Sequence, residues 1–297
     1  MESELKTTVI TKEYAKSLLP KRSDYSSKGS YGSVVNIAGS MMYPGASYLS
    51  SISALKVGCG LVRLATTTNV IPTVASMSPD ITFIDLGESD NYTIPKDAHK
   101  ILKEIKEPSV YSIGCGLSLD NNTQDFILNF LKNNIDNQTP IIIDADGINA
   151  LARTSKNVVL PLNSIITPHP LELSRLINVS VDTIQANRIQ YAWETSKKFD
   201  CIVLLKGHET VIAIPTGQIF INQTGNSALA KGGSGDVLTG MIAGFAAQGL
   251  NLENATCLAV YLHGLAGEVA SNVQTQYGVL ASNLVNSIPT AIKTLLD

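Results

Sequence analysis

The sequence predicts a single large α/β domain built on a mostly parallel sheet. The chain has 297 residues, of which 44% are hydrophobic and 16% are charged, so it has enough apolar material for one sizeable core. Short continuous apolar runs, such as residues 34–38, are typical of strands buried on both faces of a sheet. Helical segments separate these runs, as βαβ units require. No linker or change of composition divides the chain, so residues 1–297 are expected to form one domain.

The first half of the chain contains the elements of repeated βαβ units. The segment 1–30 enters the domain with a short helix near 12–19, and a Ser- and Gly-rich loop covers 23–32. Strands are predicted at 34–38, 61–65, 110–113, 141–143, 164–166 and 201–205. Helices are predicted between them at 46–57, 125–131, 171–177 and 183–198. Asp182 is the predicted cap of the last of these helices, with Gln185 at the reciprocal capping-box position.

The pattern changes in the last third of the chain. Residues 210–214 and 218–222 flank a Pro-Thr-Gly turn and predict an antiparallel hairpin. A glycine-rich loop and a helix ending near Gly249 follow, because glycine suits the position after a helix that needs a positive φ. Two further helices are predicted at 252–273 and 281–296.

The glycine-rich loop before that helix is the strongest functional signal. Gly232, Gly233, Ser234 and Gly235 lead directly into Asp236 and an apolar helical repeat. Glycine allows close approach of the backbone to a ligand, and the free N–H groups of a helix N-terminus favour a phosphate. A carboxylate beside such an anion hole can accept the proton of an attacking hydroxyl. The alternative is an ordinary turn with a favourable first-turn acid.

Other polar residues follow the predicted strands at the same edge of the sheet. Gly116, Asp146, His169 and Lys206 each lie just after a strand. In open α/β sheets, ligands bind outside the carboxyl ends of the strands. These residues and the loop before Asp236 are therefore expected to share one rim.

Single residues on this rim also have structural interpretations. The segment 206–210 either cradles a nucleotide through Lys206 or is a solvated hairpin entrance. His169 lies between two prolines that restrict its loop, so it is a held site residue or a structural histidine. Glu172 can cap the next helix or reach a metal through water. Three side chains in apolar helical stretches are expected in the core: Trp193, Cys257 and His263.

Composition and missing motifs exclude several classes of protein. A net charge of −3 and no basic aromatic stripe argue against nucleic-acid binding, and no run is apolar enough for a membrane span. The N-terminus is too polar for a signal peptide, and four scattered cysteines without a CxxC pair predict a cytoplasmic protein with free thiols. Walker A, Rossmann and HExxH motifs are absent, which argues against those nucleotide folds and against a zinc site. The partial G-x-S-x-G match at 232–236 lacks a positioned His and acid, so a serine hydrolase is not predicted.

With these residues in view, the chain resembles the ADP-dependent NAD(P)H-hydrate dehydratases of the ribokinase-like superfamily. The resemblance covers residue 19 to the C-terminus and implies a three-layer α/β/α sandwich. It rests on ordered blocks at 28–29, 37–40, 45–46, 113–117, 144–147, 167–172, 206–207 and 232–240. The block Pro168-His169-Pro170 separates this family from the sugar and vitamin kinases of the superfamily, many of which carry Asn where His169 stands.

The resemblance implies an ADP-driven repair reaction. The C6 hydroxyl of the S epimer of hydrated NADH or NADPH would be phosphorylated and eliminated, restoring the cofactor and releasing AMP and phosphate. Asp236 would be the catalytic base, and Gly232 to Gly235 the anion hole. The hydrated nicotinamide would contact Ala46, Gly116, His169 and Asp236. AMP would contact Lys206, Gly207, His208, Glu209, Thr210 and Gly235.

The resemblance also implies partners. Magnesium is expected to bridge the phosphates of ADP, without an assigned protein ligand. The family often forms tetramers, and many relatives carry a fused epimerase domain, for which this chain has no room. A separate epimerase is therefore expected. Two other functions remain open at this point: a small-molecule kinase that stops after phosphoryl transfer, and a nucleotide-binding module without activity.

Overall fold

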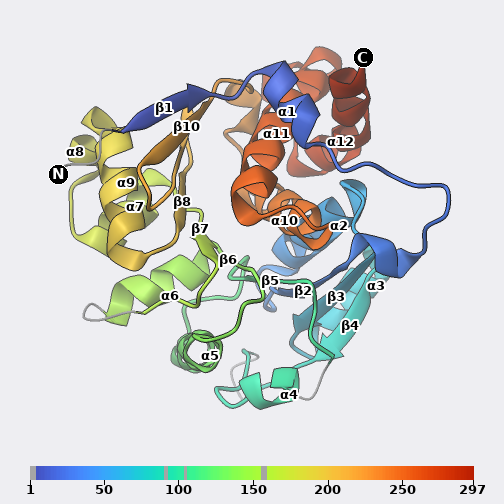
Figure 1. Cartoon of the computed structure of the whole chain (residues 1–297). Coiled ribbons are helices and arrows are strands. Elements are labelled where there is room, and N and C mark those ends of the chain that lie inside the picture. Colours follow the sequence, from blue (N-terminus) through green and yellow to red (C-terminus); the bar gives the residue numbers. More distant parts are fainter. Residues whose placement is uncertain (1–4, 90–92, 104–105, 155–158) are drawn as a thin grey trace.

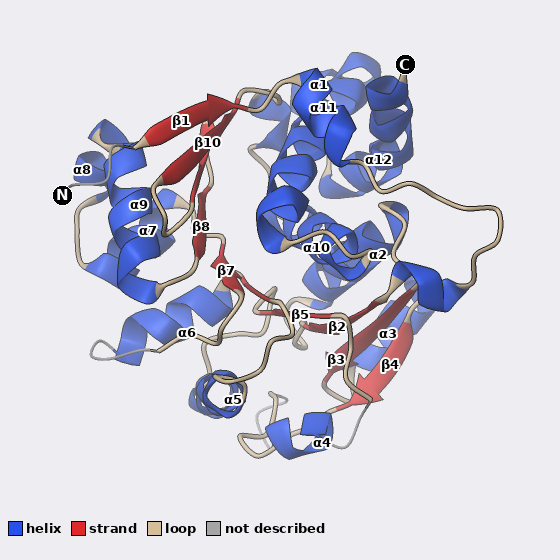
Figure 2. Cartoon of the chain, in the orientation of Figure 1, coloured by secondary structure: helices blue, strands red, loops and turns tan. Residues whose placement is uncertain are grey.

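A ten-stranded sheet forms the centre of the computed structural model, which describes residues 5–89, 93–103, 106–154 and 159–297. The strand order is β1-β10-β9-β8-β7-β6-β5-β2-β3-β4, and Figure 2 shows the strands following one another across the molecule. β9 runs antiparallel to both of its neighbours, and the other pairings are parallel. Figure 1 shows helices on both sides of this sheet, so the expected three-layer α/β/α sandwich is confirmed.

The strands are short, as expected for a sheet buried on both faces. They are β1 Lys6–Val9, β2 Ser33–Ile37, β3 Leu61–Thr66, β4 Thr82–Asp85, β5 Val110–Ile113, β6 Ile141–Ile143, β7 Ser164–Ile166, β8 Ile202–Leu205, β9 Thr210–Ala213 and β10 Gln218–Asn222. β9 and β10 form the predicted antiparallel hairpin.

Two helical layers cover the sheet. The helices are α1 Lys12–Leu18, α2 Pro44–Lys56, α3 Val70–Met77, α4 His99–Lys103, α5 Asn121–Asn133, α6 Asp146–Thr154, α7 Pro170–Ile177, α8 Val181–Ala186, α9 Arg188–Phe199, α10 Ser234–Ala247, α11 Leu252–Gly278 and α12 Ala281–Leu296. Figure 1 shows α2, α10, α11 and α12 on one side of the sheet and α5 to α9 on the other. Among the described residues, no helix is long and apolar enough to cross a bilayer.

Alternation along each strand creates two separate cores. Ile142 packs with the α2, α10 and α11 side, whereas its neighbours Ile141 and Ile143 pack with the α5 to α9 side. Successive residues of a strand point to opposite faces, so a continuous apolar run supplies both cores at once. The continuous runs in the sequence therefore predicted the buried strands correctly.

The strand order reverses between β2 and β5, and this reversal places the site. The chain proceeds from β2 outward through β3 and β4, then returns to β5 beside β2 and continues outward through β6, β7 and β8. The connections after β2 and β5 consequently leave on opposite faces of the sheet (Figure 1). A crevice at the carboxyl ends of the strands is expected at such a point.

Several local predictions were wrong. Residues 183–198 do not form one helix: the backbone leaves helical geometry at Asn187, which separates α8 from α9. The cap of α8 is Ser180, whose side chain accepts from the N–H of Thr183, and Asp182 lies inside the first turn. The predicted loop at 23–32 contains a short 3₁₀ helix at Lys28–Tyr31. The sequence analysis also missed five elements, namely β1, α3, β4, α4 and α6.

The close packing of α10 on α2 depends on Gly240. A Cβ atom at Gly240 would lie 2.0 Å from the carbonyl oxygen of Ser50 on α2, which is far below van der Waals contact. The two helices can therefore approach this closely only without a side chain at position 240. This contact fixes α10, which carries Asp236, against the sheet.

We predict that Gly240→Ala lowers the free energy of unfolding by about 2–3 kcal/mol, because the added methyl group forces α10 away from α2. Gly278→Ala is the matched control, since the nearest atom to its new Cβ would be 3.7 Å away. Urea denaturation of both variants measures the difference. Equal stability of the two variants would show that α10 and α2 are not held at this distance.

Candidate active site

A buried carboxylate, Asp144, lies at the centre of the candidate site. Asp144 is 1% exposed and follows β6 directly. Its Oδ1 accepts hydrogen bonds from Lys206 Nζ at 2.8 Å and from Thr167 Oγ1 at 2.8 Å. Its Oδ2 accepts one from Thr239 Oγ1 at 2.7 Å, and the thiol of Cys115 lies 3.8 Å away. Asp144 therefore joins the ends of four neighbouring strands, β5 to β8, to helix α10.

These hydrogen bonds favour the charged form of Asp144. Burial alone would raise its pKa, but Lys206 and the two threonine hydroxyls lower the pKa below its usual value. Asp144 also keeps Lys206 protonated, since the carboxylate raises the pKa of the lysine against the effect of burial. The pair is thus a buried ion pair with additional hydrogen bonds, the arrangement that compensates for the loss of hydration.

Lys206 connects this carboxylate to the rest of the predicted rim. Its Nζ lies 3.8 Å from Glu172 Oε2, and its backbone N–H donates to Pro168 O at 2.9 Å. A Cβ atom built on Gly235 would lie 3.4 Å from the same Nζ, so the ammonium group is beside the glycine-rich loop. The predicted residues Lys206 and Gly235 therefore lie together.

His169 and Glu172 form the cap of α7. The Nδ1 atom of His169 accepts from the N–H groups of Leu171 at 3.1 Å and Glu172 at 3.3 Å, and Glu172 Oε2 accepts from the N–H of His169 at 2.8 Å. This reciprocal arrangement is a capping box. Of the two interpretations of Glu172, the helix cap is therefore the one observed. Burial, and then Lys206, lower the pKa of His169, which leaves a neutral ring with its proton on Nε2.

The glycine-rich loop opens directly into α10, as predicted. Gly233 is the N-cap with φ of 90°, a conformation that favours glycine, and no side chain caps the helix. The N–H of Ser234 donates to Lys231 O at 3.2 Å and that of Val237 to Gly233 O at 3.1 Å, so the N–H groups of Gly235 and Asp236 are the ones left free in this first turn. His263, a buried residue of α11, donates from Nε2 to the carbonyl oxygen of Ser234 at 2.9 Å. His263 is a core residue, as predicted, and it also fixes the first turn of α10.

Asp236 lies in that first turn, one helical turn before Thr239. Residues three apart share a face of a helix, so the bond from Thr239 to Asp144 also turns Asp236 toward the strand ends. Burial raises the pKa of Asp236 to about 7, with a further contribution from the negative charge of Asp144, while Cys115 and Lys206 act in the opposite direction. A carboxylate with this pKa can take up and release a proton near neutral pH.

Ala46 and Gly116 are in contact at the strand reversal. Ala46 lies in the first turn of α2 after β2, and Gly116 follows β5. A Cβ atom on Gly116, where φ is 63°, would lie 2.7 Å from Ala46 Cβ and 2.8 Å from Tyr43 Cβ. Only glycine at position 116 allows the two loops to approach each other this closely. The two predicted residues thus line the same wall.

The other residues predicted to contact the nucleotide do not join Lys206 in its buried cluster. Gly207, His208 and Glu209 are exposed, and Thr210 is buried with its hydroxyl bonded to Gly207 O at 2.8 Å. His208 and Glu209 line a pocket of about 410 Å³ together with the α8–α9 junction and residues of β9 and β10. Their contact with a nucleotide stays a prediction.

Four site residues escaped the sequence analysis because their roles depend on tertiary contacts. Asp144, Thr167 and Thr239 were recognised only as parts of a strand end or a helix. Arg188 donates from Nη2 to Leu205 O at 3.0 Å and Lys206 O at 3.3 Å and so supports the backbone before Gly207. Three polar residues, Asp144, Thr167 and Lys206, stand directly after β6, β7 and β8. This repeated placement is the sequence feature from which their clustering could have been predicted.

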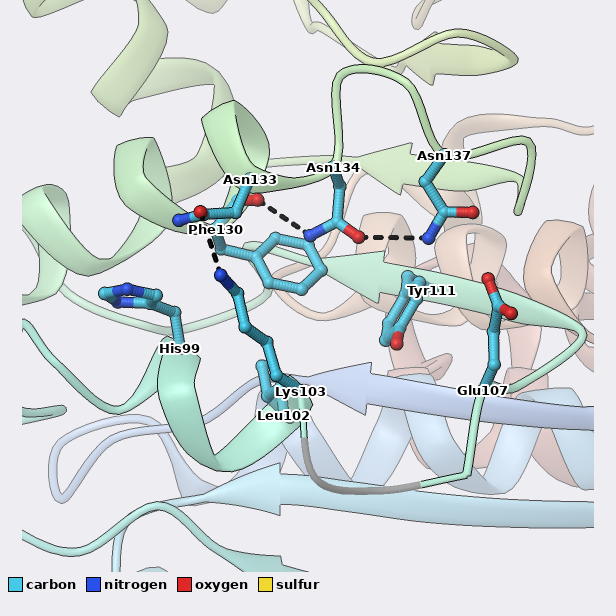
Figure 3. A pocket seen from close by; sticks show the side chains of 9 residues that line it. All are labelled: His99, Leu102, Lys103, Glu107, Tyr111, Phe130, Asn133, Asn134 and Asn137. Carbon is cyan, nitrogen blue, oxygen red and sulfur yellow. Dashed lines mark hydrogen bonds between the residues drawn. The ribbon is translucent and has the colours of Figure 1, made fainter.

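A second pocket lies at the opposite end of β5 (Figure 3). It has a volume of about 250 Å³ and is lined by side chains of α4, α5 and the start of β5, including His99, Lys103 and Tyr111. Within the described part of the chain, no three His, Cys, Asp or Glu side chains are grouped to hold a metal ion, here or elsewhere.

The fold and the site define a ribokinase-like α/β protein whose uncapped helix N-terminus, lysine and carboxylate suit phosphoryl transfer. A family model described as NAD(P)H-hydrate dehydratase matches residues 34–290. The chain therefore belongs to the NAD(P)H-hydrate dehydratase family, and the predicted family is confirmed.

Three relatives illustrate this membership. The ADP-dependent (S)-NAD(P)H-hydrate dehydratase of Bacillus subtilis is 36% identical over 94% of this chain and 95% of its own length. A crystal structure of the ADP/ATP-dependent enzyme from B. subtilis, co-crystallised with ATP and Mg²⁺, has a TM-score of 0.83, with 33% identity over 98% of this chain and 99% of that one. A ribokinase-like superfamily protein of Enterococcus faecalis has a TM-score of 0.84, with 26% identity over 97% and 96% of the two chains.

A longer relative matches only in part. The bifunctional NAD(P)H-hydrate repair enzyme of Moorella thermoacetica is 38% identical over 97% of this chain. The match covers 54% of that relative, so this chain spans about half of its length.

We predict that Lys206→Met destabilises the fold by roughly 3–5 kcal/mol at neutral pH, because it leaves the charge of Asp144 buried and unpaired. The loss should shrink at acidic pH, where Asp144 can be neutralised by a proton. Lys132→Met is the matched control, since Lys132 is an exposed residue of α5. Thermal or urea denaturation that gives the same value for both variants would contradict the role of the Asp144–Lys206 pair.

We also predict a pH-dependent stabilisation by Asp236→Asn. The pKa of Asp236 is about 7 in the fold, above the ordinary 3.8. Below pH 4 the carboxyl is protonated in both the folded and the unfolded chain, so it does not reduce stability. As the pH rises to 7, the unfolded chain loses this proton first, so the free energy of unfolding falls. The variant should therefore match the wild type near pH 4 and exceed it by roughly 4 kcal/mol near pH 8. Urea denaturation at both pH values, with exposed Asp182→Asn as the control, measures this gap. A gap that is the same at both pH values would contradict the raised pKa.

Proposed function

We propose that this chain dehydrates the S epimer of hydrated NADH or NADPH at the expense of ADP and releases AMP and phosphate. The observation that carries this proposal is Asp236, a carboxylate with a pKa of about 7 in the first turn of an uncapped helix. The relatives named above as ADP-dependent NAD(P)H-hydrate dehydratases support it.

The proposed reaction has two steps. Asp236 takes the proton of the C6 hydroxyl, whose oxygen attacks the terminal phosphorus of ADP, and AMP departs. The ring nitrogen then expels phosphate by breaking the C6–O bond, and loss of a proton from C5 restores the double bond. Hydroxide is a poor leaving group and phosphate a good one, so the first step makes the second possible.

Each predicted contact has a place in this proposal. The nicotinamide of the substrate lies against Ala46, Gly116 and His169, within reach of Asp236. The loop of Gly232, Gly233, Ser234 and Gly235 holds the transferred phosphoryl group through the N–H groups of its three glycines, because the N–H of Ser234 donates to Lys231 O at 3.2 Å. The AMP part of the nucleotide lies along residues 206–210, where Lys206 adds a positive charge beside Gly235.

Magnesium completes the nucleotide site in this proposal. Two carboxylates of the site, Asp144 and Glu172, are already engaged by Lys206, and Asp236 serves as the base. The ion is therefore expected on the phosphates and water, a common arrangement for Mg²⁺ in phosphoryl transfer. It would stabilise the negative charge that develops on the phosphoryl oxygens. The B. subtilis structure co-crystallised with ATP and Mg²⁺ supports this expectation.

The biological setting is also proposed. Residues 1–297 act as one catalytic domain in the cytoplasm, where the four buried cysteines remain free thiols. A separate epimerase supplies the S epimer, and the chain works as a homotetramer without nucleic-acid or membrane partners. The bifunctional relative, twice as long, supports the pairing of two repair activities.

The test of this function is a turnover assay with hydrated NADH, Mg²⁺ and ADP. The reaction is monitored through the return of the absorbance of reduced nicotinamide. Recovery together with AMP and phosphate is expected. No recovery with ADP or ATP, on verified substrate, would contradict the proposal. A stable phosphorylated product would instead indicate a kinase.

We predict that Asp236→Asn keeps nucleotide affinity but lowers turnover about 10²–10⁴-fold, the usual loss for a missing general base. The wild-type rate should rise with pH through about 7, because only the deprotonated carboxylate accepts the hydroxyl proton. Calorimetric titration with ADP and the turnover assay separate binding from catalysis. An unchanged rate would remove Asp236 from the mechanism.

A further inference from the structure

We propose that the turn between β2 and α2, residues 40–45, binds the adenosine end of the dinucleotide substrate. The turn would place an apolar surface against the adenine and the N–H of Gly45 against one oxygen atom of the same half. This inference rests on the proposed function, because it extends the nicotinamide site along the same substrate.

Three consecutive side chains of this turn are apolar and exposed. Met41 is 57%, Met42 78% and Tyr43 55% exposed. A turn with this much apolar surface is unusual on a folded protein and indicates a binding site. Methionine adapts its shape to flat rings and contacts them through its polarisable sulfur, and tyrosine offers a face for stacking. These properties suit a planar purine.

The turn continues directly from the wall that is predicted to hold nicotinamide. Tyr43 Cβ lies beside Gly116, and Ala46 follows three residues later in the first turn of α2. A substrate held against Ala46 and Gly116 therefore has this turn as its immediate neighbour. The second half of a dinucleotide can reach it without crossing another element.

The same turn leaves one open backbone donor beside the apolar side chains. Pro44, the first residue of α2, has no N–H, and the N–H groups of Tyr43 and Ala46 donate to Ser40 O at 2.9 Å and to Tyr43 O at 3.3 Å. The N–H of Gly45 stays free, and a Cβ atom on Gly45 would have no neighbour within 4 Å, so the approach to this N–H is open. It can donate to one oxygen atom of a substrate whose adenine contacts the apolar side chains.

The alternative occupant is a second subunit. A stable interface usually buries about 800 Å² on each partner and involves roughly 20–30 residues on each side. The apolar part of this turn consists of three side chains, which is far smaller than such an interface. An apolar surface of this size fits one adenine ring better than a protein surface.

The test compares two substrates, hydrated NADH and hydrated reduced nicotinamide mononucleotide, which lacks the adenylate half. In a variant with both Met41→Ser and Met42→Ser, KM for hydrated NADH should rise roughly tenfold, while kcat stays within about twofold. KM for the mononucleotide should not change. Met77→Ser, an exposed methionine at the end of α3, is the matched control and should leave both substrates unaffected.

Three results would overturn the inference. They are an unchanged KM for hydrated NADH in the double variant, equal losses for the two substrates, and a change of oligomeric state in sedimentation, which would assign the turn to a subunit contact. Failure of the function itself is distinguishable, because the wild type would then turn over neither substrate. In that case, calorimetric binding of NADH to wild type and double variant still tests the turn: weaker binding to the variant is expected, and equal binding would overturn the inference.

Discussion

The structure depends on the need to pair one buried negative charge, that of Asp144. A carboxylate with almost no solvent contact is tolerated only when its oxygens are fully hydrogen-bonded and its charge is matched. Lys206, Thr167 and Thr239 meet this need, and each comes from a different element. The pairing therefore fixes the ends of β7 and β8 and the rotation of α10 relative to β6.

The chemistry of the site follows from this pairing. Thr239 places Asp236 on the face of α10 that looks toward the strand ends, where burial and the charge of Asp144 raise the pKa of the carboxyl to about 7. Lys206 compensates Asp144 and stands beside the uncapped N-terminus of α10. Structural stability and reactivity are thus joined, because the residues that hold the sheet ends together also set the charge around the proposed base.

The sequence predicted most of the central sheet and the helix that carries Asp236, because continuous apolar runs and the glycine-rich loop are local signals. It failed for β1 and β4, whose strand character comes from pairing with β10 and β3 rather than from burial on both faces. It joined α8 and α9, since nothing in the local pattern marks the break at Asn187. The sequence marked Asp144 only as a residue at a strand end, because its importance lies in partners 23 to 95 residues away.

The central claim is that the site transfers a phosphoryl group to the C6 oxygen before that oxygen leaves the ring. Hydrated NADH prepared in oxygen-18 water carries the label in this hydroxyl, so the fate of the label tests the claim directly. Phosphorylation followed by elimination breaks the C6–O bond after the oxygen has bonded to phosphorus. The account predicts one labelled oxygen in each released phosphate. Unlabelled phosphate, with the label in water, would contradict it.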